Sequence, residues 1–287
     1  MQKTLYDFNN KHTGDTIYIF GSSPTLNNLS KDQKDFLKKQ ITIGVNLSYE
    51  GFNDLTCAVS AHIANAVYLF ESTSRNFPIF VDYASPRKKD AFSHLENFFW
   101  NNERIVKFSS DPTCIPLHKK VNPRDISLQG NTSVLLLATH LAYIMGAANI
   151  VYIGFEELIA AHFWNDKPDL EQKMINNFEK ILNDPKYNSS KYNSINNYDI
   201  HFNVYKEIEY IIGKLPNSIS LFDLSNSEYN NSFWGQFKHL PPAEANIRDF
   251  SLYNFFLSKN KIKTFTYSTE GITIKSGCRK IKNLKII

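Results

Sequence analysis

The sequence predicts an α/β fold in which a mostly parallel sheet is flanked by helices. Two observations favour this class: apolar runs of strand length recur along the chain, and one of them follows a buried helix after a short connector. Of the 287 residues, 42% are hydrophobic and 14% aromatic, enough to fill one large core. No internal repeat and no clear linker divides the chain. We therefore expect one α/β domain with a smaller lid-like loop subdomain.

Four segments in the first third of the chain have the length and apolar composition of buried strands. They are TIYIF (16–20), ITIGVN (41–46), CAVS (57–60) and PIFVDY (78–83). The first of them ends in a tight turn that begins at Gly21. A helix is expected to follow that turn over Lys31–Lys39, with Ser30 as its N-cap.

The middle of the chain contains the clearest helix signal. Over residues 133–145 the apolar side chains recur every three or four positions, and Gly146 supplies a stop. The strand NIVYIGFEE (149–157) follows at once. Helix, short connector and buried strand in that order are what a parallel crossover requires. The preceding stretch, 84–125, is polar and rich in proline, which indicates loops around a helix near Phe92–Trp100.

Towards the C-terminus, residues 183–200 are rich in Asn, Ser and Tyr and are expected to form the lid-like loop. A helix over 202–212 and a strand over 218–225 should follow. The α/β domain is expected to span residues 1–258, with a basic segment, 259–287, after it. Eight basic residues of that segment accompany one acid, Glu270; they are Lys259, Lys261, Lys263, Lys275, Arg279, Lys280, Lys282 and Lys285.

Composition limits the class of protein. The formal net charge of +4 is too small and too dispersed to indicate a nucleic-acid partner. The cysteines, Cys57, Cys114 and Cys278, are far apart and predict neither a disulfide framework nor a structural zinc site, which fits a reducing compartment. No segment has the apolar length of a signal peptide or a membrane span. The sequence thus predicts a cytoplasmic globular protein.

The first candidate binding segment is the turn Gly21, Ser22, Ser23, Pro24 and Thr25. A glycine there lets the backbone approach a ligand, and serine hydroxyls and free amides at a helix start bind phosphate. The turn has neither the GxGxxG spacing of dinucleotide sites nor the GK[ST] of a P-loop. It is equally interpreted as a turn that merely ends a strand.

Other polar residues follow or precede apolar segments in the same way. Asn46 comes directly after the second strand. At this position a short amide can read a base or a ribose; the alternative is that Asn46 is an ordinary turn residue. The buried helix is preceded by Asn131, Thr132 and Ser133. They are interpreted as N-cap residues or as contacts to an anionic ligand at the helix start. His201 lies between the lid-like loop and a helix, where a histidine suits a general base, although the chain has eight histidines.

The segment Gly154-Phe155-Glu156 closes a strand, at a place where carboxylates hold a metal or a ribose. No second acidic motif accompanies it, and the chain has no DxD, HExxH, GxSxG or EF-hand pattern. The sequence therefore predicts neither a metal nor another cofactor.

These segments in this order resemble the bacterial sialyltransferases of glycosyltransferase family 42 and, more widely, the Rossmann-like superfamily that includes the MptE-like (DUF115) proteins. Their order and spacing carry the resemblance, which implies a Rossmann-like sheet in a GT-A-variant arrangement. The matching segments are IYIFGSSPTL (17–26), ITIGVNLSY (41–49), NTSVLLLATHLAYIMGAANIVYIGFE (131–156), YDIHFNVYKEIEYI (198–211) and SISLFDLSNS (218–227).

The resemblance implies an inverting, metal-independent glycosyltransferase that uses a CMP-activated, sialic-acid-like donor. Ser22 and Ser23 would contact the donor's phosphate or adjoining sugar, Asn46 the nucleotide, and Thr132 and Ser133 the donor sugar. The acceptor would be a glycan or glycolipid of a surface polysaccharide, in lipopolysaccharide or capsule biosynthesis.

The basic segment 259–287 would hold such an enzyme at the inner face of an anionic membrane, as a peripheral protein, or is simply a solvated terminus. The oligomeric state, a homo-oligomer included, stays open.

The loop after residue 156 departs from the family pattern. His201 would take the proton from the acceptor hydroxyl, and two tyrosines would hydrogen-bond the departing phosphate. Here Leu158 falls near the first tyrosine position and His162 near the second; a histidine can replace a tyrosine as a donor, and a leucine cannot. Glu156 stands where Asp is usual. These departures bear on the identity of the sugar more than on the fold.

Three alternatives remain beside the transferase. A pterin pyrophosphokinase, as the MptE-like branch implies, would depend on Mg²⁺ and ATP. A non-catalytic nucleotide- or glycan-binding protein on the same scaffold would fit the missing tyrosines. A sugar transferase acting on DNA would need a basic patch that the composition does not indicate.

Overall fold

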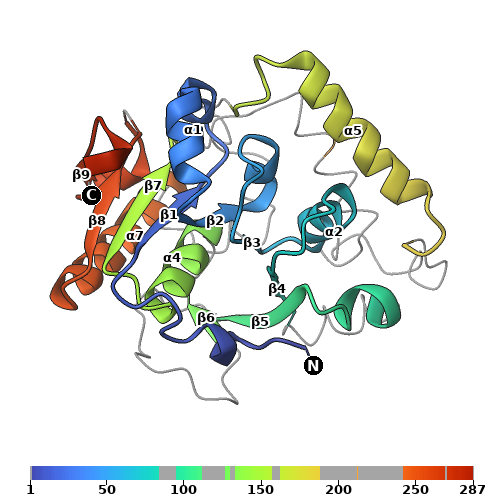
Figure 1. The fold of residues 1–287 in the computed structure, drawn as a ribbon, viewed down its shortest axis with the longest axis horizontal. Coiled ribbons are helices and arrows are strands. Elements are labelled where there is room, and N and C mark those ends of the chain that lie inside the picture. Colours follow the sequence, from blue (N-terminus) through green and yellow to red (C-terminus); the bar gives the residue numbers. More distant parts are fainter. Residues whose placement is uncertain are drawn as a thin grey trace.

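The computed structural model describes residues 2–83, 95–111, 127–129, 133–156, 162–187, 212, 242–268 and 270–286. Within them, nine strands form one sheet in the order β6-β5-β4-β3-β2-β1-β7-β8-β9, and every adjacent pair is parallel (Figure 1). The strands are β1 Thr16–Phe20, β2 Ile41–Val45, β3 Cys57–Ser60, β4 Ile79–Asp82, β5 Ile105–Asp111, β6 Ser127–Gln129, β7 Asn149–Ile153, β8 Lys263–Thr266 and β9 Arg279–Lys280.

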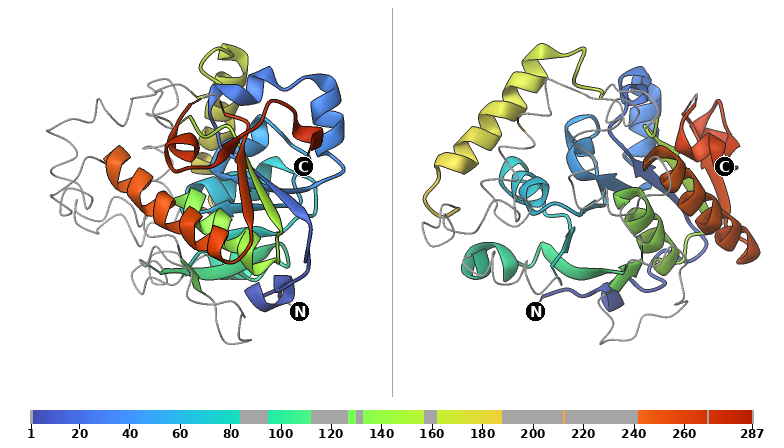
Figure 2. Two further views of the ribbon diagram at one scale, coloured as in Figure 1. Left: turned by 90° about the vertical axis from the view of Figure 1, so that its left-hand side faces the viewer. Right: turned by 180° about the vertical axis from the view of Figure 1, so that it is seen from behind.

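Helices cover both faces of this sheet (Figure 2). Side chains of α1, α2 and α5 join one core cluster, and side chains of α4 and α7 join the other. The helices are α1 Lys31–Leu37, α2 Ile63–Ser72, α4 Val134–Ile144, α5 Pro168–Asn183, α7 Pro242–Lys259 and α8 Ile272–Lys275. Short turns of helix are η1 Leu5–Phe8, η2 Pro24–Asn28, η3 Asn46–Glu50, η5 Glu96–Trp100 and η9 Leu284–Ile286.

The strand β1 explains why the central strands are apolar throughout. Ile17 and Ile19 pack into the cluster under α4, whereas Tyr18 and Phe20 pack into the cluster under α1 and α2. A strand that is buried on both faces cannot alternate polar with apolar residues. The continuous run TIYIF therefore predicts a central parallel strand, and the structure confirms it.

The order in which strands are added to the sheet reverses at β1. From β1 to β6 each strand is added on one side, and the chain then returns through α4 to β7 on the other side of β1. In an open parallel sheet, ligands bind outside the carboxyl ends of the strands where the strand order reverses. In this Rossmann-like fold, the turns that follow β1 and β7 lie at that point.

Most predicted elements of the first half are confirmed. β1 and β3 have the predicted bounds, and β2 and β4 are slightly shorter than predicted. Ser30 caps α1, because its hydroxyl accepts from the Gln33 amide while the Gln33 side chain accepts from the Ser30 amide. The buried helix before β7 is α4, and the chain leaves it through Gly146 at a φ of 88°.

The structure contains β6 and the helices α2 and α5, which the sequence analysis did not predict, and it corrects two further expectations. Ile105–Asp111, expected among loops, is the strand β5, which pairs with β4. The expected boundary at residue 258 falls within the last turn of α7, and the following segment supplies β8, which pairs with β7, and then β9. Basic residues obscured these strands in the sequence: β8 begins with the exposed Lys263 and is buried only at Phe265 and Thr266, and the edge strand β9 consists of the exposed Arg279 and Lys280.

Several predictions lie outside the described residues. They are the lid-like loop beyond Tyr187, the helix over 202–212 apart from Ile212, and the strand over 218–225. In the part of the chain that is described, no helix combines the length and the hydropathy needed to cross a bilayer.

Candidate functional site

The turns after β1 and β7 interlock at the point where the strand order reverses. The Gly21 amide donates to the Ile153 carbonyl at 2.8 Å, and the Ser23 amide donates to the Gly154 carbonyl at 3.1 Å. A Cβ atom on Gly21 would stand 2.2 Å from the Gly154 oxygen, and Gly154 itself has a φ of 77°. The missing side chain of Gly21 therefore makes room for the neighbouring turn, rather than for a ligand on that side as the sequence suggested.

The side chain of Glu156 is fixed by the same turn. The Ser23 hydroxyl oxygen accepts from the Glu156 amide at 3.0 Å, and the Thr25 hydroxyl donates to Glu156 Oε1. Glu156 is only 2% exposed, and its Oε2 has no hydrogen-bond partner among the described residues. An unpartnered oxygen on a buried carboxylate is costly, so it marks a place where a ligand hydroxyl would be stabilising.

Ser22 is half-buried, and its side chain contacts His162. The Ser22 hydroxyl lies 3.2 Å from His162 Nδ1, and the Ser22 carbonyl accepts from the Phe163 amide at 2.9 Å. The imidazole stacks on the Trp164 ring with centroids 4.2 Å apart and an interplanar angle of 16°. The His162 amide also donates to Asn165 Oδ1 at 2.6 Å. Backbone and ring are therefore both held in place.

Burial lowers the pKa of His162 below its ordinary value of 6.5, and the contact with Ser22 offsets part of that effect. The imidazole is therefore neutral at pH 7, with one ring nitrogen that donates and one that accepts. If Nδ1 accepts from the Ser22 hydroxyl, Nε2–H is the donor. If Nδ1 donates instead, the Ser22 hydroxyl can donate onward. In either state the pair offers a proton donor to an anionic oxygen.

The next two strands add polar groups at the same edge of the sheet. Asn46 follows β2 in the left-handed region, with a φ of 49°, and its Oδ1 lies 3.2 Å from the Ser60 hydroxyl at the end of β3. That hydroxyl also lies 2.7 Å from the His62 carbonyl oxygen. Asn46 Nδ2 donates to none of the described residues, so it remains available to a ligand.

His62 was missed in the sequence analysis. It precedes the first residue of α2 and follows β3 by two positions, so it lies at the same sheet edge as Asn46. Its signal was the same as that of Asn46: a polar side chain shortly after a buried apolar strand.

Ser133 caps the helix that crosses between β6 and β7. Its carbonyl accepts from the Leu136 and Leu137 amides, and its side chain makes no capping hydrogen bond. α4 packs against β1, β2 and β3 and starts at the carboxyl end of the sheet, as a parallel crossover requires. The helix start therefore lies towards the same edge.

Three predicted site residues cannot be placed, because Asn131, Thr132 and His201 lie outside the described residues. The others follow strands β1, β2 and β7 or precede α4: Gly21, Ser22, Ser23, Pro24, Thr25, Asn46, Ser133, Gly154, Glu156 and His162. Of these, Pro24 starts η2, where the ring of a proline favours the first turn of a helix. The part of the chain that can be described contains no group of three His, Cys, Asp or Glu side chains spaced to hold a metal ion.

The chemistry of this edge is that of a polar anion and hydroxyl site. It combines a neutral imidazole next to a serine hydroxyl, an amide donor, the start of a helix and a buried carboxylate with one unpartnered oxygen. Groups of these kinds can contact a phosphate, a base and sugar hydroxyls. Comparison with known proteins adds no constraint, since no protein-family model and no curated protein matches the chain.

Proposed function

We propose that this chain is an inverting, metal-independent glycosyltransferase that transfers a CMP-activated acidic sugar to a surface glycan. The observation that supports it best is the interlocked pair of turns after β1 and β7, which brings the Ser22–His162 pair to the point where the strand order reverses. Parallel sheets bind nucleotides at that point.

The nucleotide would be recognised by three kinds of group. The Asn46 amide would read the base or ribose, because it presents both a donor and an acceptor. Glu156 Oε2 would accept a hydrogen bond from a ribose or sugar hydroxyl. Ser22 and the start of α4 at Ser133 would contact the phosphate and the donor sugar, where the helix dipole favours an anion.

The reaction would be a direct displacement. The oxygen of the acceptor hydroxyl attacks the anomeric carbon, the bond from that carbon to the phosphate oxygen breaks, and CMP leaves with the bonding electrons. The acceptor proton passes to His201, the proposed base. His162 would donate a hydrogen bond to the departing phosphate in place of a tyrosine. Because only one phosphate carries the new charge, hydrogen bonds suffice to stabilise it.

The test is to titrate the protein with CMP by calorimetry and to measure CMP release from CMP-sialic acid in the presence of EDTA. Binding and release are expected in the parent, with release reduced about a hundredfold in His162→Phe and binding weakened in Asn46→Gly. His12→Gln, at the opposite end of β1, is the matched control and should behave like the parent.

Three outcomes would contradict the proposal. If neither CMP nor a CMP-sugar binds, the nucleotide site is assigned wrongly. If instead AMP forms from ATP and a pterin only when Mg²⁺ is present, the pyrophosphokinase alternative replaces the transferase. Binding of CMP without release from any CMP-sugar would favour the non-catalytic alternative.

A further inference from the structure

The exposed face of α7 carries two large apolar side chains that the fold leaves in solvent. Phe255 is 61% exposed and Leu252 is 45% exposed; in the described part of the chain, Tyr6 is the other large apolar residue classed as exposed. Leu252 and Phe255 are three positions apart on one helix, so they are neighbours on its surface. Exposed apolar side chains that gather in this way commonly mark an interaction surface.

Basic residues flank this apolar pair. Arg248 and Lys259 lie four residues before Leu252 and four after Phe255, which places all four on one side of α7. Lys259 Nζ lies 5.1 Å from the centre of the Phe255 ring. Arg248 is neutralised in part, because its guanidinium pairs with the buried Asp249 at 2.9 Å. Its contribution to the surface charge is therefore small.

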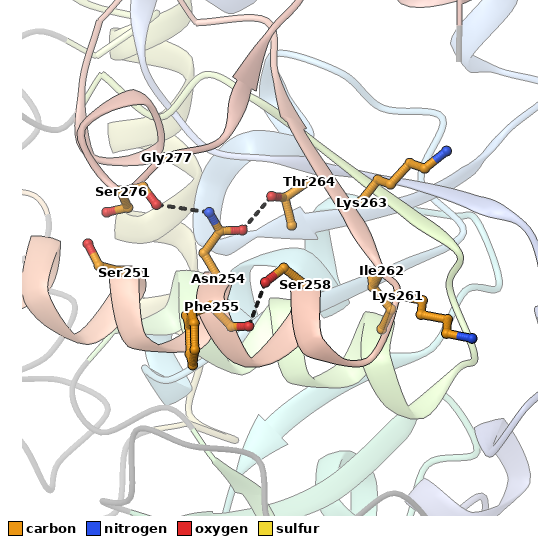
Figure 3. Close-up of a pocket in the computed structure, with 10 residues that line it drawn as sticks. All are labelled: Ser251, Asn254, Phe255, Ser258, Lys261, Ile262, Lys263, Thr264, Ser276 and Gly277. Carbon is orange, nitrogen blue, oxygen red and sulfur yellow. Dashed lines mark hydrogen bonds between the residues drawn. The ribbon is translucent and has the colours of Figure 1, made fainter.

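A cleft of about 550 Å³ adjoins this face of α7, between the helix and β8 (Figure 3). Asn254 closes its floor, since its amide donates to the Ser276 carbonyl at 2.8 Å and its Oδ1 accepts from the Thr264 hydroxyl. Lys261 and Lys263 extend from the end of the cleft at which α7 stops (Figure 3). We define the α7 patch as Leu252, Phe255, Lys259, Lys261 and Lys263.

The charge of the surrounding segment indicates the partner. Residues 242–286 contain nine Lys and Arg against three Asp and Glu, whereas the whole chain has a formal net charge of only +4. Three of these basic residues, Lys259, Lys261 and Lys263, are exposed at the end of α7 and just after it, within the α7 patch. A second copy of this chain would bring like charges together across a two-fold interface, which disfavours self-association.

We propose that the α7 patch docks the protein on an anionic lipid bilayer. An interfacial helix of this kind buries apolar side chains at the boundary between headgroups and acyl chains, while lysines beside it contact the anionic headgroups. Lysine side chains suit this position because their long stems reach the headgroups and keep the ammonium in water. With two apolar side chains and three lysines, the contact is reversible and peripheral, and it is independent of the reaction at the carboxyl end of the sheet.

The test is co-sedimentation of the full chain with vesicles of phosphatidylcholine alone or mixed with phosphatidylglycerol. Binding is expected only to the mixed vesicles, and added salt should release the protein. The triple variant Lys259→Glu, Lys261→Glu, Lys263→Glu should abolish binding. The pair Leu252→Ser, Phe255→Ser should weaken it about tenfold, as the loss of two exposed apolar contacts predicts. All five side chains are exposed or at a rim, so these variants should keep the parent's circular dichroism and melting temperature.

Two matched variants serve as controls. Lys31→Glu with Lys39→Glu reverses exposed charge at the start of α1 and in the turn after it, and Tyr6→Ser removes the exposed aromatic residue near the N-terminus. Neither should change vesicle binding. Equal binding to both kinds of vesicle, no binding at low salt, or unchanged binding in the α7 variants would overturn the proposal. So would a dimer in sedimentation equilibrium that Phe255→Ser dissociates, because the patch would then be a protein interface.

Discussion

Gly21 and Gly154 approach so closely that a Cβ atom on Gly21 would lie 2.2 Å from the Gly154 carbonyl oxygen. The same Cβ would lie 2.9 Å from the Phe155 ring. Two consecutive backbone hydrogen bonds, from Gly21 to Ile153 and from Ser23 to Gly154, hold the turns at this distance. The candidate site therefore depends on a contact between two backbones, which side-chain motion cannot relieve.

Gly21→Ala should destabilise the protein by about 3 kcal/mol, because overpacking against backbone forces the two turns apart. Urea denaturation followed by circular dichroism measures the effect. Gly14→Ala is the matched control: a Cβ there meets nothing within 4 Å, and its φ of 88° costs only about 1 kcal/mol of backbone strain. Equal losses in the two variants would show that the contact with Gly154 is unimportant.

Glu156→Gln should leave the free energy of unfolding unchanged or raise it slightly. The substitution keeps an acceptor for the Thr25 hydroxyl and removes the charge of a carboxylate that is 2% exposed with one unpartnered oxygen. Affinity for CMP should fall about tenfold if that oxygen accepts from a ligand hydroxyl. Calorimetry and urea denaturation on the same preparation separate the two effects. Thr25→Val is the comparison. It removes the hydroxyl that donates to Glu156 Oε1, so its free energy of unfolding should fall.

Protonation of His162 should lower the free energy of unfolding in mild acid. Burial lowers its pKa in the folded state below 6.5, so the unfolded chain binds more protons as the pH falls through 6.5. The contribution is present above pH 6.5 and is lost as the pH falls towards the folded-state pKa. His162→Gln should flatten the fall in unfolding free energy over that window. An identical pH profile for His162→Gln and the parent would contradict this account.

Asn46 should tolerate glycine better than a branched residue. Its φ of 49° lies in the left-handed region, which Gly adopts freely and Val does not. Asn46→Val should cost about 1–2 kcal/mol more than Asn46→Gly in thermal or urea unfolding. Both variants lose the amide that contacts Ser60 and should bind CMP more weakly than the parent. If both unfold alike, backbone strain at this position is not significant.

The elements that the sequence predicted well are those whose signal is local. The Ser30 cap and its partner Gln33 lie within one turn of helix, and the apolar run of β1 follows from burial on both faces. α5 was missed although a signal was present: Met174, Phe178 and Ile181 recur at helical spacing and are buried. The surrounding Asn and Lys residues obscured that stripe.

The site was harder to predict than the fold because its contacts join distant residues. Ser22 and His162 are 140 positions apart, and Thr25 and Glu156 are 131 positions apart. The sequence indicated most of these positions one at a time, from their place after apolar strands. It could not show that Ser23 and Thr25 hold Glu156 rather than a ligand, because that follows only from how β1 and β7 pair.

The pairing of β1 with β7 also has a consequence for synthesis on the ribosome. Thr16 lies opposite Asn149 in this parallel pair, and their side chains are hydrogen-bonded across 133 positions of sequence. Until the second partner leaves the exit tunnel, the first strand has an open edge, and closing so long a loop is slow. The nascent chain would thus carry an unpaired strand edge while the 133 positions between Thr16 and Asn149 are translated, and such an edge is a natural substrate for chaperones.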